Sequence, residues 1–188
     1  MKNTFIALLI ATTLSSCLNF AVRALAYPKW KPHYKVWGGQ VFYLVPNAAG
    51  GSSRPVEGAD PSTFKQLSYE YGKDRYRAYF WERRIKNSDP DSFELLENGY
   101  ARDKNSIYSG GGVTPGDPGS VVILGNVTYM DKHNVYDVHV WRDSKNNECS
   151  ELKKVKSESH FRRMGASEDL IRKTRRERAK RGWTPLPR

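Results

Sequence analysis

The sequence predicts a mainly β protein built from tandem β-hairpin repeats with one-turn helices, followed by a C-terminal α-helix. Three observations support this fold class: a spacing pattern that recurs three times, β-branched and aromatic residues around each recurring turn, and helix start and stop signals at Ser167 and Gly182. Because internal repeats indicate stacked units, the repeat is the first feature to interpret.

Two aspartates and one tyrosine at constant spacing define the repeat. In each full copy, an Asp-Pro pair precedes a second aspartate by 14 residues, and a tyrosine follows the second aspartate by five. Successive copies start 29 and 28 residues apart. The Asp-Pro aspartates are Asp60, Asp89 and Asp117, and the second aspartates are Asp74, Asp103 and Asp131. We interpret each copy as one supersecondary unit that buries its apolar face only by stacking on its neighbours.

Each copy predicts a turn of helix followed by a β-hairpin. An aspartate before proline suits a helix start, because the carboxylate caps free N–H groups and proline loses nothing at the first helical position. We expect this helical turn over Asp60–Leu67 and Asp89–Leu96, whereas Val121–Leu124 is equally consistent with a buried strand. The second aspartate predicts a hairpin turn, in which its carboxylate accepts from backbone N–H groups and Asn105 takes a positive φ.

The second and third full copies carry a recognisable motif. The pattern Asp103-Lys104-Asn105-x-x-Tyr108, with Asp131-Lys132 and Tyr136 in the next copy, resembles the DKNYY repeat family of bacterial cell-envelope proteins. The resemblance covers nearly half of the chain and implies a repeat protein of the envelope, without an established activity. The chain departs from the motif where Arg75-Tyr76 replaces Lys-Asn in the first full copy.

Residues 1–26 are interpreted as a targeting segment. Lys2 provides a positive start, and an apolar run follows it. Two processing sites remain open: Cys17, after Leu-Ser-Ser, fits a lipoprotein signal in which the cysteine is acylated, and Ala24-Leu25-Ala26 fits ordinary signal cleavage. The apolar stretch falls short of the ~20 residues of a membrane-spanning helix. We therefore predict a periplasmic or cell-envelope location, with a lipid anchor if Cys17 is acylated.

The rest of the chain divides into a repeat domain at 27–143 and a basic helical tail at 144–188. The domain contains copies near 33–55, 56–84, 85–113 and 114–142. The earliest of these is degenerate, and Gly38-Gly39 between two apolar runs predicts its hairpin turn.

The tail combines a basic composition with helix signals. Residues 142–188 carry 15 Lys and Arg against 7 Asp and Glu. Ser167 is a good N-cap, and the helix should run to Arg181 and stop at Gly182. Because the helix has few apolar residues, we do not expect it to be part of the core. Its candidate residues for an anionic partner are Arg172, Lys173, Arg175, Arg176, Arg178, Lys180 and Arg181.

No catalytic residue, metal site or cofactor is predicted. Residues that recur once per unit are usually structural, so we assign the six aspartates to caps and turns. Asp131, His133, Asp137 and His139 match no metal-ligand spacing, and we expect the histidines to face solvent. The sequence has no Gly-x-Ser-x-Gly motif, P-loop or dinucleotide fingerprint.

The sequence thus predicts an exported, non-catalytic repeat domain that binds another envelope protein. An immunity or inhibitor lipoprotein is one specific form of this hypothesis. Aromatic edges suit such contacts, and they contain Tyr69, Tyr71, Tyr79 and Trp81. The alternative is an envelope-adhesion protein that binds anionic lipid or glycan through the basic tail. The net charge of +11 favours anionic partners, but export argues against nucleic acid.

Overall fold

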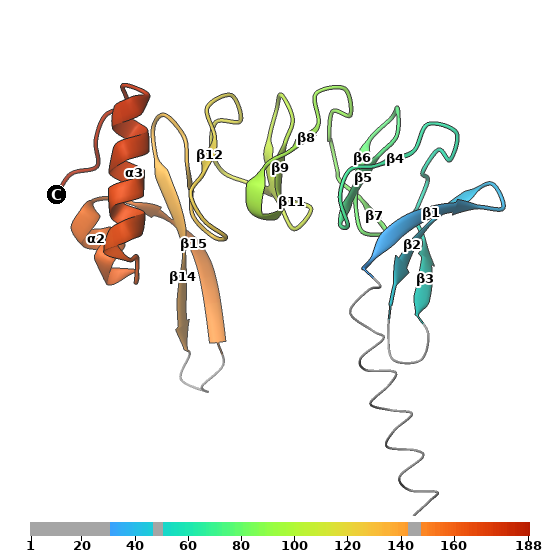
Figure 1. The fold of residues 1–188 in the computed structure, drawn as a ribbon, viewed down its shortest axis with the longest axis horizontal. Coiled ribbons are helices and arrows are strands. Elements are labelled where there is room, and N and C mark those ends of the chain that lie inside the picture. The colour runs from blue at the N-terminus through green and yellow to red at the C-terminus, as the bar shows by residue number, and fades with distance from the viewer. Residues whose placement is uncertain (1–30, 47–50, 143–147) are drawn as a thin grey trace, which may run out of the picture.

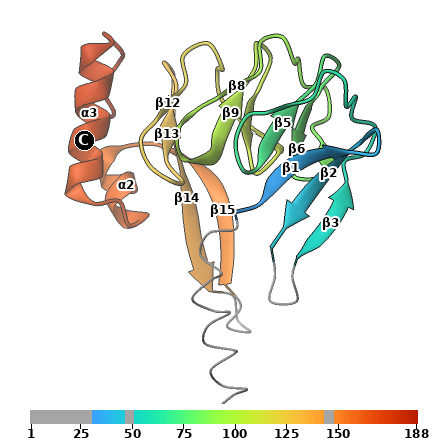
Figure 2. The same ribbon diagram turned by 45° about the vertical axis from the view of Figure 1, so that its right-hand side comes forward.

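The computed structural model describes residues 31–46, 51–142 and 148–188, with the side chains of 139–150 outside this description. The described residues form four small antiparallel sheets set side by side in chain order, and two helices cover the C-terminal end of the row (Figures 1 and 2). This confirms the mainly β class with a C-terminal α-helix. Cys17, Ala26 and the rest of the predicted targeting segment lie outside the described residues, as does the side chain of Cys149.

We call the four sheets, each with its preceding loop, units 1 to 4. Unit 1 contains β1 (His33–Trp37), β2 (Gln40–Val45) and β3 (Ser52–Pro55). Unit 2 contains β4 (Lys65–Gln66), β5 (Tyr71–Lys73), β6 (Ala78–Phe80) and β7 (Arg83–Arg84). Unit 3 contains β8 (Glu94–Leu95), the 3₁₀ turn η2 (Glu97–Gly99), β9 (Tyr100–Arg102), β10 (Ile107–Ser109) and β11 (Gly112–Thr114). Unit 4 contains β12 (Val122–Ile123), β13 (Tyr129–Met130), β14 (Val135–Arg142) and β15 (Glu148–Val155). The helices are α2 (Glu158–Arg163) and α3 (Glu168–Lys180).

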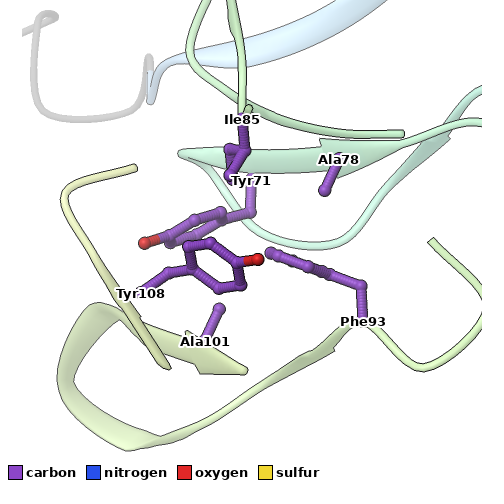
Figure 3. Close-up of a cluster of buried hydrophobic side chains, with 6 residues drawn as sticks. All are labelled: Tyr71, Ala78, Ile85, Phe93, Ala101 and Tyr108. Atoms are coloured by element: carbon purple, nitrogen blue, oxygen red, sulfur yellow. The ribbon is translucent and has the colours of Figure 1, made fainter. Parts of the chain in front are cut away.

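The hydrophobic core lies at the junctions between units. The junction of units 1 and 2 buries Tyr34, Val41, Tyr43, Val56 and Tyr79. Figure 3 shows the next cluster, where side chains of units 2 and 3 meet: Tyr71, Ala78, Ile85, Phe93, Ala101 and Tyr108. Units 3 and 4 bury Tyr100, Ile107, Ile123, Tyr129 and Tyr136. Each unit therefore depends on its neighbours for burial, as the repeat predicted.

The Asp-Pro segments differ from the predicted one-turn helices. Residues 61–63 and 90–92 form turns, and the chain then enters β4 and β8. The helix does not continue because the next residues pair with the hairpin instead, as Lys65 does with Lys73 and Glu94 with Arg102. Val122–Ile123 forms the strand that was one of the two expectations for the last copy.

Both predicted kinds of hairpin turn are present. The Gly38-Gly39 turn joins β1 and β2, with φ values of 57° and 73°. The second aspartates lie in the turns between the two central strands of units 2 to 4. Asn105 does not take a positive φ, which the structure records instead at Asn87 and Asn98.

The basic tail is part of the fold, which corrects two expectations. The border predicted at residue 143 falls within the β14–β15 hairpin, whose strands pair over eight residue pairs from Val135↔Val155 to Arg142↔Glu148. α3 is also not a purely exposed helix, because Ile171 joins a core with α2 and unit 4. That core contains Leu124, Met130, Val135, Val155, Phe161 and Ile171. The predicted helix start is correct, since the Ser167 side chain accepts from the N–H of Leu170.

Candidate functional site

The second aspartate of units 2, 3 and 4 is buried and joins three parts of its unit. In unit 3, Asp103 Oδ1 accepts from the N–H groups of Asn105 (2.7 Å) and Ser106 (2.8 Å). Its Oδ2 accepts from the hydroxyl of Tyr108 and the N–H of Asp89, at 2.7 and 2.8 Å. The two spacings of the repeat therefore have a structural cause. One carboxylate accepts from a backbone N–H 14 residues before it and from a tyrosine hydroxyl five residues after it.

Unit 2 repeats this arrangement in full, and unit 4 repeats most of it. Asp74 accepts from the Tyr79 hydroxyl at 2.7 Å and from the N–H of Asp60 at 2.8 Å. Asp131 accepts from the N–H of Asp117 and from two turn N–H groups, whereas the hydroxyl of Tyr136 accepts from Asn134.

Hydrogen bonding keeps these buried carboxylates ionised. Burial alone would raise the pKa of Asp74 and Asp103, because it disfavours the charged form. The two backbone N–H donors of the turn, the N–H of the Asp-Pro aspartate and the tyrosine hydroxyl outweigh burial, and the pKa of both aspartates lies below its ordinary value. These ionised groups are fully engaged in holding the turn.

In units 2 to 4, the Asp-Pro aspartate forms an ion pair with the basic residue that follows the second aspartate. Asp89 accepts from the N–H and hydroxyl of Ser92, and Lys104 of the turn forms an ion pair with it at 2.5 Å. The hydrogen bonds from Lys104 and Ser92 lower the pKa of Asp89 to about 2. Equivalent ion pairs join Arg75 to Asp60 (3.0 Å) and Lys132 to Asp117 (3.2 Å).

A basic residue before the second aspartate links one unit to the next. Lys73 Nζ donates to the carbonyl of Pro90 at 2.7 Å, and Arg102 Nη1 donates to the carbonyl of Pro118 at 2.7 Å. No repeat follows unit 4, and α3 supplies the contacts instead. Lys173 Nζ donates to the carbonyl of Leu124 at 2.7 Å.

The predicted anion-binding residues of α3 have different environments. For Arg178 the prediction of an anion-binding role is wrong. Arg178 is 2% exposed, and its guanidinium donates to the carbonyls of Asp131, Lys132 and Thr184. Arg178 is therefore a structural residue that joins α3 to the hairpin turn of unit 4 at Asp131 and Lys132. The ion pairs of the other predicted residues are Arg172 with Asp169, Arg175 with Glu158, and Arg181 with Glu177. Arg176 and Lys180 are exposed, and no acidic side chain of the described residues forms an ion pair with either.

The four residues considered as a catalytic or metal set do not share one site, as far as the structure describes them. Asp131 binds its own turn, His133 is exposed, and Asp137 accepts from the Thr128 hydroxyl at 2.6 Å. Burial raises the pKa of Asp137. The side chain of His139 lies outside the described residues. Among the residues that are described, no three His, Cys, Asp or Glu side chains gather closely enough to hold a metal ion.

An open, mainly apolar groove of about 560 Å³ lies where units 1, 2 and 3 meet. Its wall is formed by Pro32, Tyr43, Val45, Arg54, Ser68, Tyr69, Glu70, Tyr71, Trp81, Leu95, Leu96, Gly99 and Tyr100. Of the four aromatic residues expected at contact edges, Tyr69 and Trp81 are exposed at 49% and 41%, whereas Tyr71 and Tyr79 belong to the core. The groove thus contains the part of the predicted aromatic surface that another molecule can reach.

Trp81 occupies a position where the backbone favours glycine. It has a φ of 53°, and Gly110, which occupies the same position after the second aspartate in unit 3, has a φ of 56°. A side chain in this left-handed region costs roughly 1–2 kcal/mol. Unit 2 nevertheless has tryptophan, the largest side chain, at this position. Its ring is stacked on Phe80 at a centroid distance of 4.7 Å and lies 6.5 Å from the ring of Tyr43. A strained, half-exposed tryptophan in a groove is a candidate binding residue.

The backbone carbonyl of Glu70 fixes the position of Trp81 in the groove. The carbonyl of Glu70 accepts from the Trp81 N–H and the Tyr34 hydroxyl, both at 2.7 Å. Arg54 of the groove wall forms an ion pair at 3.1 Å with Glu82, which is not a lining residue. Burial, together with the nearby Glu70 and Glu82, raises the pKa of Tyr43 to about 12, so its hydroxyl remains a hydrogen-bond donor. The sequence did not predict this groove, because its residues come from three units.

The fold defines a repeat protein of stacked β-hairpin units with a helical C-terminal cap. Residues 77–169 match the DKNYY family, and the chain belongs to that family. The matched region contains Trp81 and the unit 3 side of the groove, whereas unit 1 precedes it. Neither the curated proteins nor the solved structures yielded a match to this chain. Within the described residues, no helix is long and apolar enough to cross a membrane.

Proposed function

We propose that this chain is an exported, non-catalytic binding protein of the bacterial cell envelope and that it holds a partner protein in the aromatic groove. The observation that carries the proposal is Trp81, which accepts a strained backbone and lies half-exposed in the groove. Aromatic residues in well-packed grooves contribute a large share of the energy of protein interfaces. The immunity or inhibitor lipoprotein is the specific form of this function that we favour, with an envelope-directed effector as the partner.

The groove fits an extended segment of a protein. Its apolar wall would receive an aromatic or aliphatic side chain against Trp81 and Tyr69. Arg54 lies on β3, an edge strand of unit 1 whose four residues are all exposed. An edge strand offers backbone N–H and C=O groups to a polypeptide. Arg54 also lines the groove and adds a positive group for an acidic side chain of the partner.

The test compares Trp81→Gly with the wild-type protein in affinity capture from envelope extracts, followed by measurement of the affinity for the retained protein. Glycine suits the φ of this position and is the residue of unit 3, so the fold should tolerate the change. We expect about 30-fold or greater loss of affinity, since interface hot spots contribute ≥ ~2 kcal/mol. The control is Tyr76→Ala, which removes a 58% exposed aromatic side chain outside the groove.

Two outcomes would end the proposal. One is that no single protein is retained by the wild-type chain. The other is that Trp81→Gly and Tyr76→Ala retain the partner equally well.

The envelope-adhesion alternative is tested in the same experiment. α3 uses several of its cations within the fold, so Arg176 and Lys180 are the residues of the predicted set that remain available to anionic lipid or glycan. The double variant Arg176→Ala, Lys180→Ala should keep the partner protein at high salt. Salt-sensitive loss of envelope binding in this variant, with Trp81→Gly unaffected, would favour adhesion instead.

A further inference from the structure

A second open pocket, of about 430 Å³, lies between the hairpins of unit 2 and the start of the loop that leads into unit 3, and it has a different chemistry from the groove. It is lined by Tyr76, Arg77, Arg84, Ile85, Lys86, Asn87 and Ser88. None of these residues lines the groove. We infer that this pocket is an anion site that binds the phosphate of a phosphorylated ligand through Arg77, Arg84 and Lys86.

The three cations of the pocket are not used within the described part of the protein. No acidic side chain there forms an ion pair with Arg77, Arg84 or Lys86. This differs from the basic residues that directly follow the second aspartates, since Arg75, Lys104 and Lys132 each pair with an Asp-Pro aspartate. Three unpaired positive charges around one hollow repel one another, and an anion would relieve that repulsion.

Comparison of units 2 and 3 shows that the fold does not require the charges of Arg77 and Arg84. Arg77 and Ser106 hold the same place in their turns, because each carbonyl accepts from the N–H of the second aspartate. Arg84 and Val113 correspond as well, since they pair with Tyr79 and Tyr108. In unit 3 the two arginines are therefore replaced by serine and valine, and the hairpin still forms. The charges of Arg77 and Arg84 are therefore a surface property of unit 2.

The base of the pocket is held in place by the core. Ile85 is buried, and its carbonyl accepts from the Ser88 hydroxyl at 3.0 Å. Ser88 Oγ in turn accepts from the N–H of Ala78 at 2.9 Å. The backbone that bears Lys86 is thus joined to β6, so the fold fixes where this cation leaves the chain.

Phosphate is the anion that fits this set of groups. Two guanidinium groups present planar, paired N–H donors that match the oxygens of a phosphate, and lysine adds a compact charge. Tyr76 also lines the pocket, with the Arg75 guanidinium 4.7 Å from its ring centre, and its exposed ring is available to the group to which the phosphate is attached. The phosphate would come from a soluble compound or from a phospholipid headgroup.

The test is a double variant that gives unit 2 the residues of unit 3, Arg77→Ser with Arg84→Val. Inorganic pyrophosphate is titrated by calorimetry, and binding is measured to phosphatidylcholine vesicles with and without phosphatidylglycerol. We expect about 30-fold weaker binding than wild type, taking ~1 kcal/mol for each basic residue at an anionic surface. The control, Arg176→Ala with Lys180→Ala, removes the same charge from α3 and should change binding less than about threefold.

The result separates the sources and can overturn the inference. Pyrophosphate binding that depends on Arg77 and Arg84 indicates a soluble phosphorylated ligand. Binding to phosphatidylglycerol vesicles alone, with the same dependence, indicates a headgroup. The inference is wrong if wild type binds neither probe, or if the pocket variant and the α3 variant lose binding equally. Because Trp81 is unchanged in both variants, this outcome is independent of the groove and its partner.

Discussion

Units 2 and 3 share one hydrogen-bond network and differ at the tips of their hairpins. Asp74 and Asp103 make the same contacts to their turns, to a tyrosine and to an Asp-Pro N–H group. After that tyrosine the units diverge, with Trp81 in one and Gly110 in the other at nearly the same φ. The difference separates two roles within one chain, because shared residues hold the fold and unshared residues shape the surface.

The largest effect should follow the loss of a shared aspartate. Asp103→Ala removes four hydrogen bonds to a buried carboxylate and leaves the Tyr108 hydroxyl and three N–H groups without their acceptor. We expect a loss of about 3–5 kcal/mol in the free energy of unfolding, measured by urea denaturation. Asp74→Ala should have a similar effect. If only one of the two variants is destabilised, the equivalence of the units is wrong.

The buried guanidinium of Arg178 extends the comparison to unit 4, where a helix takes the place of a following unit. Arg178→Met keeps the apolar volume but leaves the carbonyls of Asp131, Lys132 and Thr184 without a donor. We expect a loss of about 2–3 kcal/mol by thermal or urea unfolding. Arg176→Met, on the exposed face of the same helix, should stay within about 0.5 kcal/mol of wild type. Equal effects of the two variants would contradict the capping role of α3.

The shared aspartates also predict sensitivity to acid. Their pKa lies below the unfolded value of about 4, so the stability that they contribute is complete above that pH and is lost as pH falls through the folded pKa. The raised pKa of Asp137 acts in the opposite direction. We expect the urea midpoint to fall between pH 5 and pH 2, as two or more lowered groups outweigh one raised group. The fall should be smaller in Asp103→Ala, and an equal fall would assign acid sensitivity to other groups.

The smallest effect concerns the residue by which the two hairpin tips differ. At a φ of 53°, Trp81→Gly should be more stable than Trp81→Ala by about 1 kcal/mol, because alanine retains the strain that glycine avoids. Gly110→Ala in unit 3 should lose about the same amount. Urea unfolding of the three variants measures both differences. If Trp81→Ala is the more stable of the pair, the backbone at this position is not strained.

The sequence by itself determined the repeat and its internal logic. The spacings of 14 and five residues arise because one carboxylate accepts from the N–H of an Asp-Pro aspartate before it and from a tyrosine hydroxyl after it. Contacts between residues so close in the chain produce a pattern that the sequence shows directly. The Gly38-Gly39 turn and the Ser167 N-cap were predictable for the same reason. The one-turn helices were not correct, because pairing of β4 and β8 with the hairpins overrode local helix signals.

Only the tertiary structure decided what lies between units. The groove takes residues from three units, and Arg178 contacts a turn 46 and 47 residues away, so neither has a local signal. The composition of α3 predicted an exposed basic tail. In the structure, α2 and α3 cover the apolar face of unit 4, because no further unit packs against it. The charges of Arg77, Arg84 and Lys86 were visible in the sequence, but their gathering around one pocket without acidic partners depended on the hairpin that brings them together.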